Sequence, residues 1–173
     1  KDIAEVILPA LIRTRGNANP KNIGIYVLPA ERSMAVAELE NEYVLKNLLL
    51  QVDGKYDYVI FDCPPYISEF TVNILAATDK VLVPATVDKD ALEGYGELID
   101  TINLLKSNGV NPNLDVLGVF LTIYNERELF DRYMAKECAE TFGDTYIDIP
   151  IRRHTYAKQS ALFGRPLCWY KPS

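Results

Sequence analysis

The stretch Tyr56–Gly94 reads YDYVIFDCPPYISEFTVNILAATDKVLVPATVDKDALEG, and it decides the predicted fold. Two short runs in it, Val59–Phe61 and Val81–Val83, are continuously apolar rather than alternating. Strands of this kind are buried on both faces, as in a parallel sheet that helices cover on both sides. Between the two runs, the spacing of apolar residues predicts a helix over Glu69–Ala77. A strand, a helix and a second strand in this order favour an α/β fold.

The same alternation continues along the whole chain. Short apolar runs predict strands at Ile23–Leu28, Tyr56–Phe61, Lys80–Pro84, Val116–Thr122 and Thr145–Ile149. Helical spacing predicts helices at Ile3–Ile12, Ser33–Val52, Glu69–Ala77, Asp90–Ser107, Glu126–Phe142 and Tyr156–Phe163. Asp90 is the expected N-cap of the helix that Asn108-Gly109 ends. The predicted fold class is α/β, a doubly wound, mostly parallel sheet flanked by helices, in which ligands bind at the carboxyl ends of the strands.

The composition is that of a globular domain. The 173 residues include 24 acidic and 18 basic side chains, which gives a net charge of −6, and 49% of the residues are hydrophobic. A chain of this length buries roughly 70% of its unfolded surface, so we expect a single domain over residues 1–173. The acidic balance excludes a strongly basic coat for nucleic acid, although not a local basic patch. No apolar run approaches the ~20 residues of a membrane helix.

The cysteines and the first residue bear on the origin of the chain. Its three cysteines are far apart and form no C-x-x-C pair, so the sequence contains neither a zinc motif nor a redox motif. A reducing, cytoplasmic compartment is the simplest interpretation. Because a gene product normally begins with Met and this chain begins with Lys1, we expect an incomplete piece of a longer protein.

Asp62 stands at the carboxyl end of the apolar run Tyr58–Phe61. A Walker-B-type aspartate of P-loop NTPases holds Mg²⁺ or its water from this position. Pro64 and Pro65 then fix an extended backbone that cannot continue a β-ladder, and a rigid turn of this kind suits a switch beside a phosphate. The alternative is an ordinary acid that caps or solubilises the end of a strand.

Two other predicted strands are followed by polar residues. Asp88, Asp90 and Glu93 could face a metal or another subunit, and they could equally be first-turn acids that the helix dipole favours. Hydroxyl and amide groups in Leu121–Asn125 could read a nucleotide base, although loops of this composition are also common caps. Both interpretations stay open for each group.

Basic residues gather near the end of this otherwise acidic chain: Arg152, Arg153, His154, Lys158 and Arg165. They could contact DNA phosphates or a nucleotide, and the alternative is a solvated face. Cysteine chemistry between Cys63 and His154 is not expected. A phosphatase loop would carry an arginine six residues after the cysteine, and that residue is Glu69.

Taken together, these residues resemble the ParA-type partition ATPases of the MinD/ParA deviant-Walker superfamily. The matching parts are the block YDYVIFDCPP, the helix end TVNILAATD, the strand VLVP and the helix start ALEG, in the order of that family. The later segments GVFLTIYNERE and FGRPL also fit, and the similarity runs from about Ile23 to Pro172. The resemblance implies a P-loop NTPase-like fold of the SIMIBI class.

The resemblance also implies an ATP-dependent switch that drives the partition of plasmid or chromosome DNA. Such proteins bind ATP and Mg²⁺, form homodimers around two nucleotides, bind DNA nonspecifically, respond to a ParB-like centromere-binding partner, and need no membrane. By this resemblance Asp62 would be the catalytic switch aspartate and would hold Mg²⁺ through water.

Further roles carried over from the family concern the nucleotide and DNA. Near the nucleotide, Cys63, Pro64 and Pro65 would form the switch backbone. Thr122 and Tyr124 would lie near the adenine, and Pro150 or Arg152 would close over the base. The DNA-binding candidates are Arg153, Lys158 and Arg165.

The chain departs from the family pattern in three places. The glycine-rich phosphate loop does not occur in it, because the Gly54-Lys55 pair precedes a predicted strand and cannot cradle phosphates. We therefore expect the loop to precede residue 1, the last family helix to follow residue 173, and this stretch alone to have weak or no ATP affinity. Segment Ile149–Arg153 fits the family's Ile-Pro-Arg segment in two registers. Ala139 stands about where many relatives carry a basic residue that contacts DNA.

Two other functions fit the same residues. A natural product without the phosphate loop would be a non-catalytic interaction module that pairs with a full-length relative or with DNA. A MinD-like site-determining ATPase would use an amphipathic C-terminal helix to bind the membrane. The DCPP and ALEG blocks favour the ParA type over the MinD type.

Overall fold

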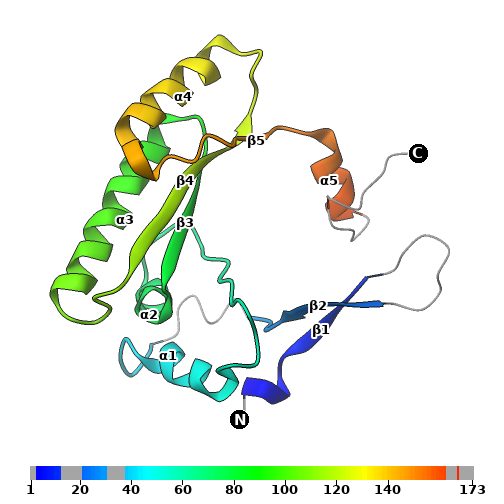
Figure 1. Cartoon of the computed structure of the whole chain (residues 1–173), viewed down its shortest axis with the longest axis vertical. Coiled ribbons are helices and arrows are strands. Elements are labelled where there is room, and N and C mark those ends of the chain that lie inside the picture. Colours follow the sequence, from blue (N-terminus) through cyan, green and yellow to red (C-terminus); the bar gives the residue numbers. More distant parts are fainter. Residues whose placement is uncertain (1–2, 13–20, 31–37, 163–166, 168–173) are drawn as a thin grey trace. The chain divides into compact units, whose positions relative to one another are not determined.

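The computed structural model describes residues 3–12, 21–30, 38–162 and 167, which form two compact units (Figure 1). One unit comprises residues 1–31 and 154–173, and the other comprises residues 32–153. Each unit is described by itself. The single ATPase domain over residues 1–173 stays a prediction.

The larger unit is built on a parallel sheet. Its strands are β3 (Lys80–Ala85), β4 (Asp115–Tyr124) and β5 (Ile151–Arg152), in the order β3-β4-β5. All pairs are parallel, with Lys80 opposite Asp115 and Ala85 opposite Leu121. The strands predicted at Lys80–Pro84 and Val116–Thr122 are confirmed. The α/β fold class is confirmed as well, since helices flank this sheet.

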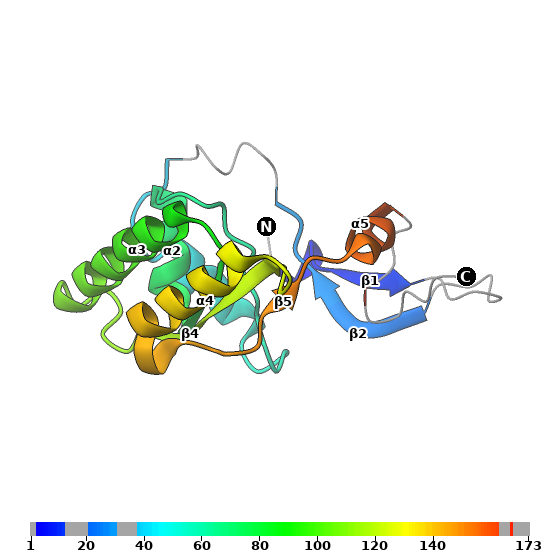
Figure 2. The same ribbon diagram turned by 90° about the horizontal axis from the view of Figure 1, so that it is seen from above.

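Three helices accompany the sheet: α2 (Glu69–Ala77), α3 (Lys89–Ser107) and α4 (Leu129–Phe142). Figures 1 and 2 show α3 and α4 along β3 and β4. The reason is a shared apolar core, in which Val119 and Leu121 of β4 are fully buried against Cys138 and Phe142 of α4 and apolar residues of α3. A second core joins α2 to the carboxyl-terminal half of α3.

The helix starts follow from their caps. The Ser68 hydroxyl accepts a hydrogen bond from the backbone N–H of Thr71 at 3.2 Å and begins α2 at the predicted residue. The predicted cap Asp90 is wrong, because the Asp88 carboxylate accepts from the N–H of Ala91 at 3.0 Å and starts α3 two residues earlier. Helix α4 begins at Leu129, after a hydrogen-bonded turn that occupies the first residues of its predicted range.

Helix α1 (Val44–Leu49) continues into a 3-10 turn at Leu50–Val52. The buried side chain of Asn73 in α2 fixes its start, since it accepts from the N–H of Leu45 at 3.2 Å and donates to the carbonyl of Asn41 at 2.9 Å. Of the helix predicted over Ser33–Val52, residues 33–37 lie outside the described residues. The described part is shorter than predicted.

Two predicted strands of this unit are wrong. The run Tyr56–Phe61 forms no strand, and its side chains at Tyr58 and Ile60 are 87% and 90% exposed, because no described strand lies beside it. The run Thr145–Ile149 makes a single bridge, from Tyr146 to Val119. A tight turn ends this run, since the N–H of Ile149 donates to the carbonyl of Ile147 at 2.8 Å. Pairing with β4 begins again at β5.

The smaller unit contains the antiparallel pair β1 (Leu8–Ile12) and β2 (Lys21–Val27), a 3-10 turn at Ile3–Glu5, and helix α5 (Thr155–Leu162). The helix predicted over Ile3–Ile12 is wrong, because Pro9 lacks the N–H that a helix interior needs and suits the strand that pairs it with Tyr26. The predicted strand Ile23–Leu28 and helix Tyr156–Phe163 are confirmed within one or two residues. None of the helices described here is long and apolar enough to cross a membrane.

Candidate functional site

A cavity of about 250 Å³ opens at the carboxyl ends of β3 and β4. It lies within the larger unit and is lined by Thr86, Val87, Asp88, Thr122, Ile123, Asn125, Glu128, Asp131 and Arg153. This is the edge of a parallel sheet where ligands bind in α/β folds. Its walls combine apolar side chains with hydroxyl, amide, carboxylate and guanidinium groups, so it can pack a flat ring and hydrogen-bond its edge.

The end of β4 is strained where it reaches the cavity. Ile123 has a φ of 58°, in the left-handed region that a β-branched residue rarely adopts. The strain coincides with a bulge, since Thr122 pairs with Ile151 and Tyr124 pairs with the next residue of β5. Such strain costs about 1–3 kcal/mol and is characteristic of functional sites.

The loop after β4 is held by its own polar groups. The N–H of Asn125 donates to the buried carboxylate of Asp131 at 2.8 Å, and its side-chain amide donates to Glu128 at 2.7 Å. The side-chain oxygen of Asn125 accepts from the N–H of Arg127 at 3.2 Å. Three residues of the cavity wall are therefore fixed relative to one another before any ligand binds.

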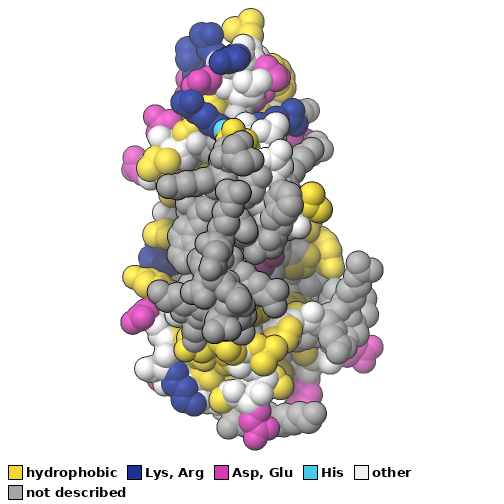
Figure 3. All heavy atoms as spheres, turned by 90° about the vertical axis from the view of Figure 1, so that its right-hand side faces the viewer, with side chains coloured by type: hydrophobic (Ala, Val, Ile, Leu, Met, Phe, Trp, Pro, Cys, Tyr) yellow, Lys and Arg dark blue, Asp and Glu magenta, His cyan; other side chains and the backbone are white. Residues whose placement is uncertain are grey.

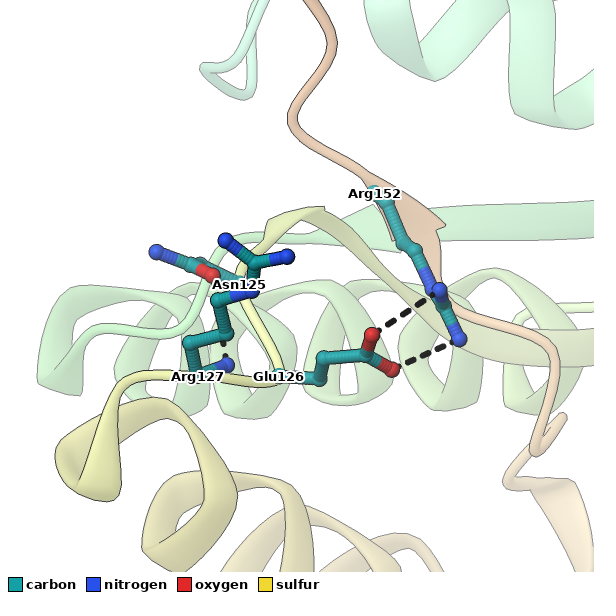
Figure 4. A network of polar contacts seen from close by, with 4 residues as sticks. All are labelled: Asn125, Glu126, Arg127 and Arg152. Atoms are coloured by element: carbon teal, nitrogen blue, oxygen red, sulfur yellow. Dashed lines mark hydrogen bonds and ion pairs between the residues drawn. The ribbon is translucent and has the colours of Figure 1, made fainter.

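The strand β5 is tied to this loop by an ion pair. The Arg152 guanidinium contacts both carboxylate oxygens of Glu126, at 3.1 and 2.7 Å (Figure 4). In Figure 4 the two side chains point toward one another, and Arg127 lies on the side of Asn125. The next residue, Arg153, donates its N–H to the carbonyl of Tyr124 at 2.9 Å and lines the cavity.

Asp88 is a helix cap that also lines the cavity. Its carboxylate accepts from the N–H of Ala91, so this acid is the N-cap of α3 and not a first-turn residue, and any role toward a ligand stays a prediction. Glu93 is exposed on α3, and the side chain of Asp90 lies outside the described residues. No group of three or more His, Cys, Asp and Glu side chains in the described part of the chain could hold a metal ion by itself.

Asp62 lies on the exposed segment between the run Tyr56–Phe61 and α2, outside the cavity lining. Among the described residues, no hydrogen-bond or ion-pair partner occupies its carboxylate. Loss of solvation, and then the negative charge of Asp62, raise the pKa of the neighbouring Cys63 thiol.

The remaining predicted site residues lie at different places. Pro64 and Pro65 follow Asp62 on the same segment, and Pro150 is half-buried just before β5. The Thr122 hydroxyl lines the cavity and donates to the carbonyl of Ala85 at 3.3 Å, whereas Tyr124 packs into the core below it. Of the nucleotide-binding residues predicted, the structure places Thr122 on the cavity. The roles assigned to all of them stay predictions.

The predicted DNA-binding residues are only partly described. Arg165 lies outside the described residues, as does the side chain of Lys158. His154 accepts a hydrogen bond at Nδ1 from the N–H of Tyr156 at 3.2 Å, and the two rings lie 4.4 Å apart. This contact gives the lone histidine a local structural role.

The sequence reasoning did not single out Glu128, Asp131 and Ile123 as cavity residues. The sequence gives little indication of a role for Asp131, because the helix dipole alone makes an acid common in the first turn of a helix. Its burial and its bond to Asn125 depend on how the loop folds back. No sequence pattern marks the left-handed conformation at Ile123, since isoleucine disfavours it.

Comparison with known proteins places this chain in a family. A family model described as an AAA domain (AAA_31) matches residues 4–116. "Chromosome partitioning protein ParA" from Caulobacter vibrioides is 34% identical over 155 residues, which are 85% of this chain and 58% of that protein. The protein of the same name from Myxococcus xanthus is 33% identical over 152 residues, 84% of this chain and 53% of its own length.

A solved structure of cobyrinic acid a,c-diamide synthase from Mycobacterium smegmatis, with a bound ATP analog and magnesium, matches with a TM-score of 0.69. It is 27% identical, and the match covers 95% of this chain and 70% of that one. The parallel sheet with its flanking helices and these matches define a P-loop ATPase fold. The chain belongs to the AAA domain family, and to its ParA-type ATPases. It spans a little more than half the length of the curated relatives it matches.

Proposed function

We propose that the protein is a cytoplasmic ParA-type ATPase whose ATP cycle segregates plasmid or chromosome DNA. The observation that carries the proposal is the 34% identity to a chromosome partitioning protein over 85% of this chain. The cavity at the carboxyl edge of the sheet gives this family likeness a physical place to bind a ligand.

In this proposal the nucleotide base occupies the cavity. A volume of about 250 Å³ is below the ~300–1,000 Å³ of pockets that enclose a whole drug-sized ligand. It therefore suits one part of a nucleotide. Val87 and Ile123 supply apolar walls for the ring, and Thr122 and Arg153 supply polar groups at its edge. The triphosphate would be held by a glycine-rich loop that these 173 residues do not contain.

Asp62 is the proposed switch aspartate. Mg²⁺ is commonly held by one or two carboxylates together with water and substrate phosphates. One exposed carboxylate with no partner among the described residues fits this mode, and a cage of several protein ligands would not be needed. When bound, the metal neutralises charge on the phosphates. Asp62 would hold the metal's water, and Pro64 and Pro65 would keep its backbone rigid.

We further propose a homodimer that binds DNA nonspecifically and responds to a ParB-like partner. Exposed basic side chains on α4 and in the loop before it support DNA contact: Arg127, Arg132 and Lys136. Figure 3 shows Lys and Arg side chains gathered at its upper end, the height that α4 occupies in Figure 1. The ion pair with Glu126 makes Arg152 a weaker candidate for DNA phosphates, because its charge is already compensated. Dimerisation and the partner rest on the family resemblance.

The test is ATP hydrolysis by the protein as its gene encodes it, with and without DNA. We expect DNA-stimulated turnover that Asp62→Ala reduces at least about 100-fold, the scale of losing one catalytic electrostatic group. Asp57→Ala is the matched control, because Asp57 is an exposed acid of the same segment with no assigned role. Equal turnover by wild type and Asp62→Ala would contradict the role of Asp62, and no turnover by wild type would contradict the ATPase.

A further inference from the structure

The Arg152–Glu126 ion pair connects the two elements that form one wall of the cavity. Glu126 belongs to the loop after β4, whose neighbours Asn125 and Glu128 line the cavity. Arg152 belongs to β5 and directly precedes Arg153, which also lines it. The pair is bidentate, with N–O distances of 3.1 and 2.7 Å. This planar, two-bond geometry fixes orientation better than a single contact would.

The connection is needed because the backbone beneath it is irregular. Strand β5 contains two residues and pairs with β4 across the bulge at Ile123, which is itself strained. A strained conformation persists only when the surrounding structure over-determines it. Two contacts do so here: the N–H of Arg153 on the carbonyl of Tyr124 at 2.9 Å, and the side-chain pair one residue away.

Arg153 is the residue that this arrangement places. Among the described residues that line the cavity it carries the one positive charge, beside the carboxylates of Asp88, Glu128 and Asp131. A guanidinium presents five donors in a fixed plane, so its effect on a ligand depends strongly on where the plane lies. Its own backbone is fixed by Tyr124, and the preceding side chain is fixed by Glu126.

We propose that the Glu126–Arg152 ion pair is a positioning latch that holds β5 on the loop after β4 and so places Arg153 on the nucleotide. The inference rests on the proposed function for the identity of the ligand. Arg152 then acts through Arg153, and neither Arg152 nor Glu126 touches the nucleotide. This separates the two neighbouring arginines by role: one is structural and the other contacts the ligand.

The test measures binding of a fluorescent ATP analogue to the whole protein. Exposed pairs contribute little, and their loss corresponds to about a 1.4- to 5-fold change in an equilibrium constant. We therefore expect Glu126→Gln and Arg152→Gln each to weaken nucleotide binding about 2- to 5-fold. The charge-exchanged protein, with Glu126→Arg and Arg152→Glu together, should recover most of the loss. Asp115→Asn, which breaks the exposed pair at the other end of the sheet, should leave binding unchanged.

A second arm tests whether the latch acts through Arg153. In an Arg153→Gln background, breaking the latch should weaken binding no further, because residues that act as a unit are not additive. Full additivity, or wild-type affinity in both latch variants, would overturn the proposal.

Hydrogen exchange separates this proposal from the proposed function. The Arg153 amide should exchange faster in Arg152→Gln than in wild type, whatever the ligand is. If wild type binds no nucleotide, the proposed function fails, and unchanged exchange at Arg153 would then also overturn the latch.

Discussion

The two ends of the parallel sheet are stabilised in different ways. At the amino end, the first residues of β3 and β4 are joined by a salt bridge of 2.8 Å between Lys80 and Asp115, and both side chains are more than half exposed. At the carboxyl end, Asp131 is only 5% exposed, and its carboxylate accepts a hydrogen bond from the N–H of Asn125. The carboxyl end also contains the bulge at Ile123.

The difference shows where this fold keeps its polar groups fixed. Loss of an exposed ion pair, such as Lys80–Asp115 or Glu126–Arg152, costs little stability because water replaces each partner. Loss of a buried acceptor costs more, because its donor would be left without a hydrogen-bond partner. Strain and buried hydrogen bonds coincide at the edge of the sheet where the cavity lies, as expected for a preorganised binding site.

The largest expected effect follows from removing the buried acceptor. Asp131→Ala should lower the free energy of unfolding by about 1–3 kcal/mol, because the N–H of Asn125 then lacks its partner. Asp131→Asn keeps an acceptor oxygen in place and should cost clearly less. Urea denaturation of both variants measures this. Equal losses would show that the carboxylate's hydrogen bond is not what fixes the loop.

A smaller effect is expected from the two bulges of β4. Leu117 and Ile123 are both extra residues on this strand and are 60% and 50% exposed, but a positive φ occurs at Ile123 and not at Leu117. Ile123→Gly relieves a left-handed conformation that costs a side chain about 1–2 kcal/mol. Leu117→Gly increases the conformational entropy of the unfolded chain without relieving strain in the folded one. It should therefore lower the free energy of unfolding by about 0.5–1 kcal/mol.

Thermal denaturation of the two glycine variants therefore compares a strained bulge with an unstrained one. Ile123→Gly should melt at a higher temperature than Leu117→Gly. The reverse order would argue that Ile123 is not strained in solution.

The smallest effect belongs to the amino end. The hydrogen bond and charge of Lys80 lower the pKa of Asp115 from its ordinary value of 3.8. A carboxylate with a lowered folded-state pKa adds stability above the unfolded value, and that stability is lost as the pH falls through the folded value. Asp115→Asn should thus be slightly less stable than wild type at neutral pH.

Acid conditions provide the check on this pair. The stability difference between Asp115→Asn and wild type should vanish once the pH lies below the lowered pKa of Asp115. Denaturant titrations at neutral and acid pH measure it. A difference that persists unchanged in acid would assign it to something other than the ion pair.

Two apolar runs show how far the fold could be predicted from sequence. Val81–Val83 and Val59–Phe61 have the same continuous apolar pattern, but the first forms a strand and the second does not. The first has β4 as a parallel neighbour, whereas no described strand lies beside the second. Periodicity reports what a segment can bury, and a strand also needs a partner for its backbone groups. The helices were predicted better, since their hydrogen bonds are local.

The site was predicted in outline only. The rule that ligands bind at the carboxyl ends of parallel strands points to Thr122 and Asp88, and both line the cavity, although their roles stay predictions. It could not distinguish Arg152 from Arg153, because the neighbouring side chains differ only in which tertiary contact each one makes. The buried position of Asp131 likewise depends on the return of the loop after β4.

Photolabelling with 8-azido-ATP tests the central claim, that the cavity at the carboxyl edge of the sheet receives the nucleotide base. The reactive group sits on the base, so the label should fall on residues 86–88, 122–131 or 153 of the whole protein. Excess ATP should prevent this labelling, and Asp115→Asn should leave it unchanged. ATP-sensitive labelling confined to other segments, or no ATP-sensitive labelling at all, would contradict the account.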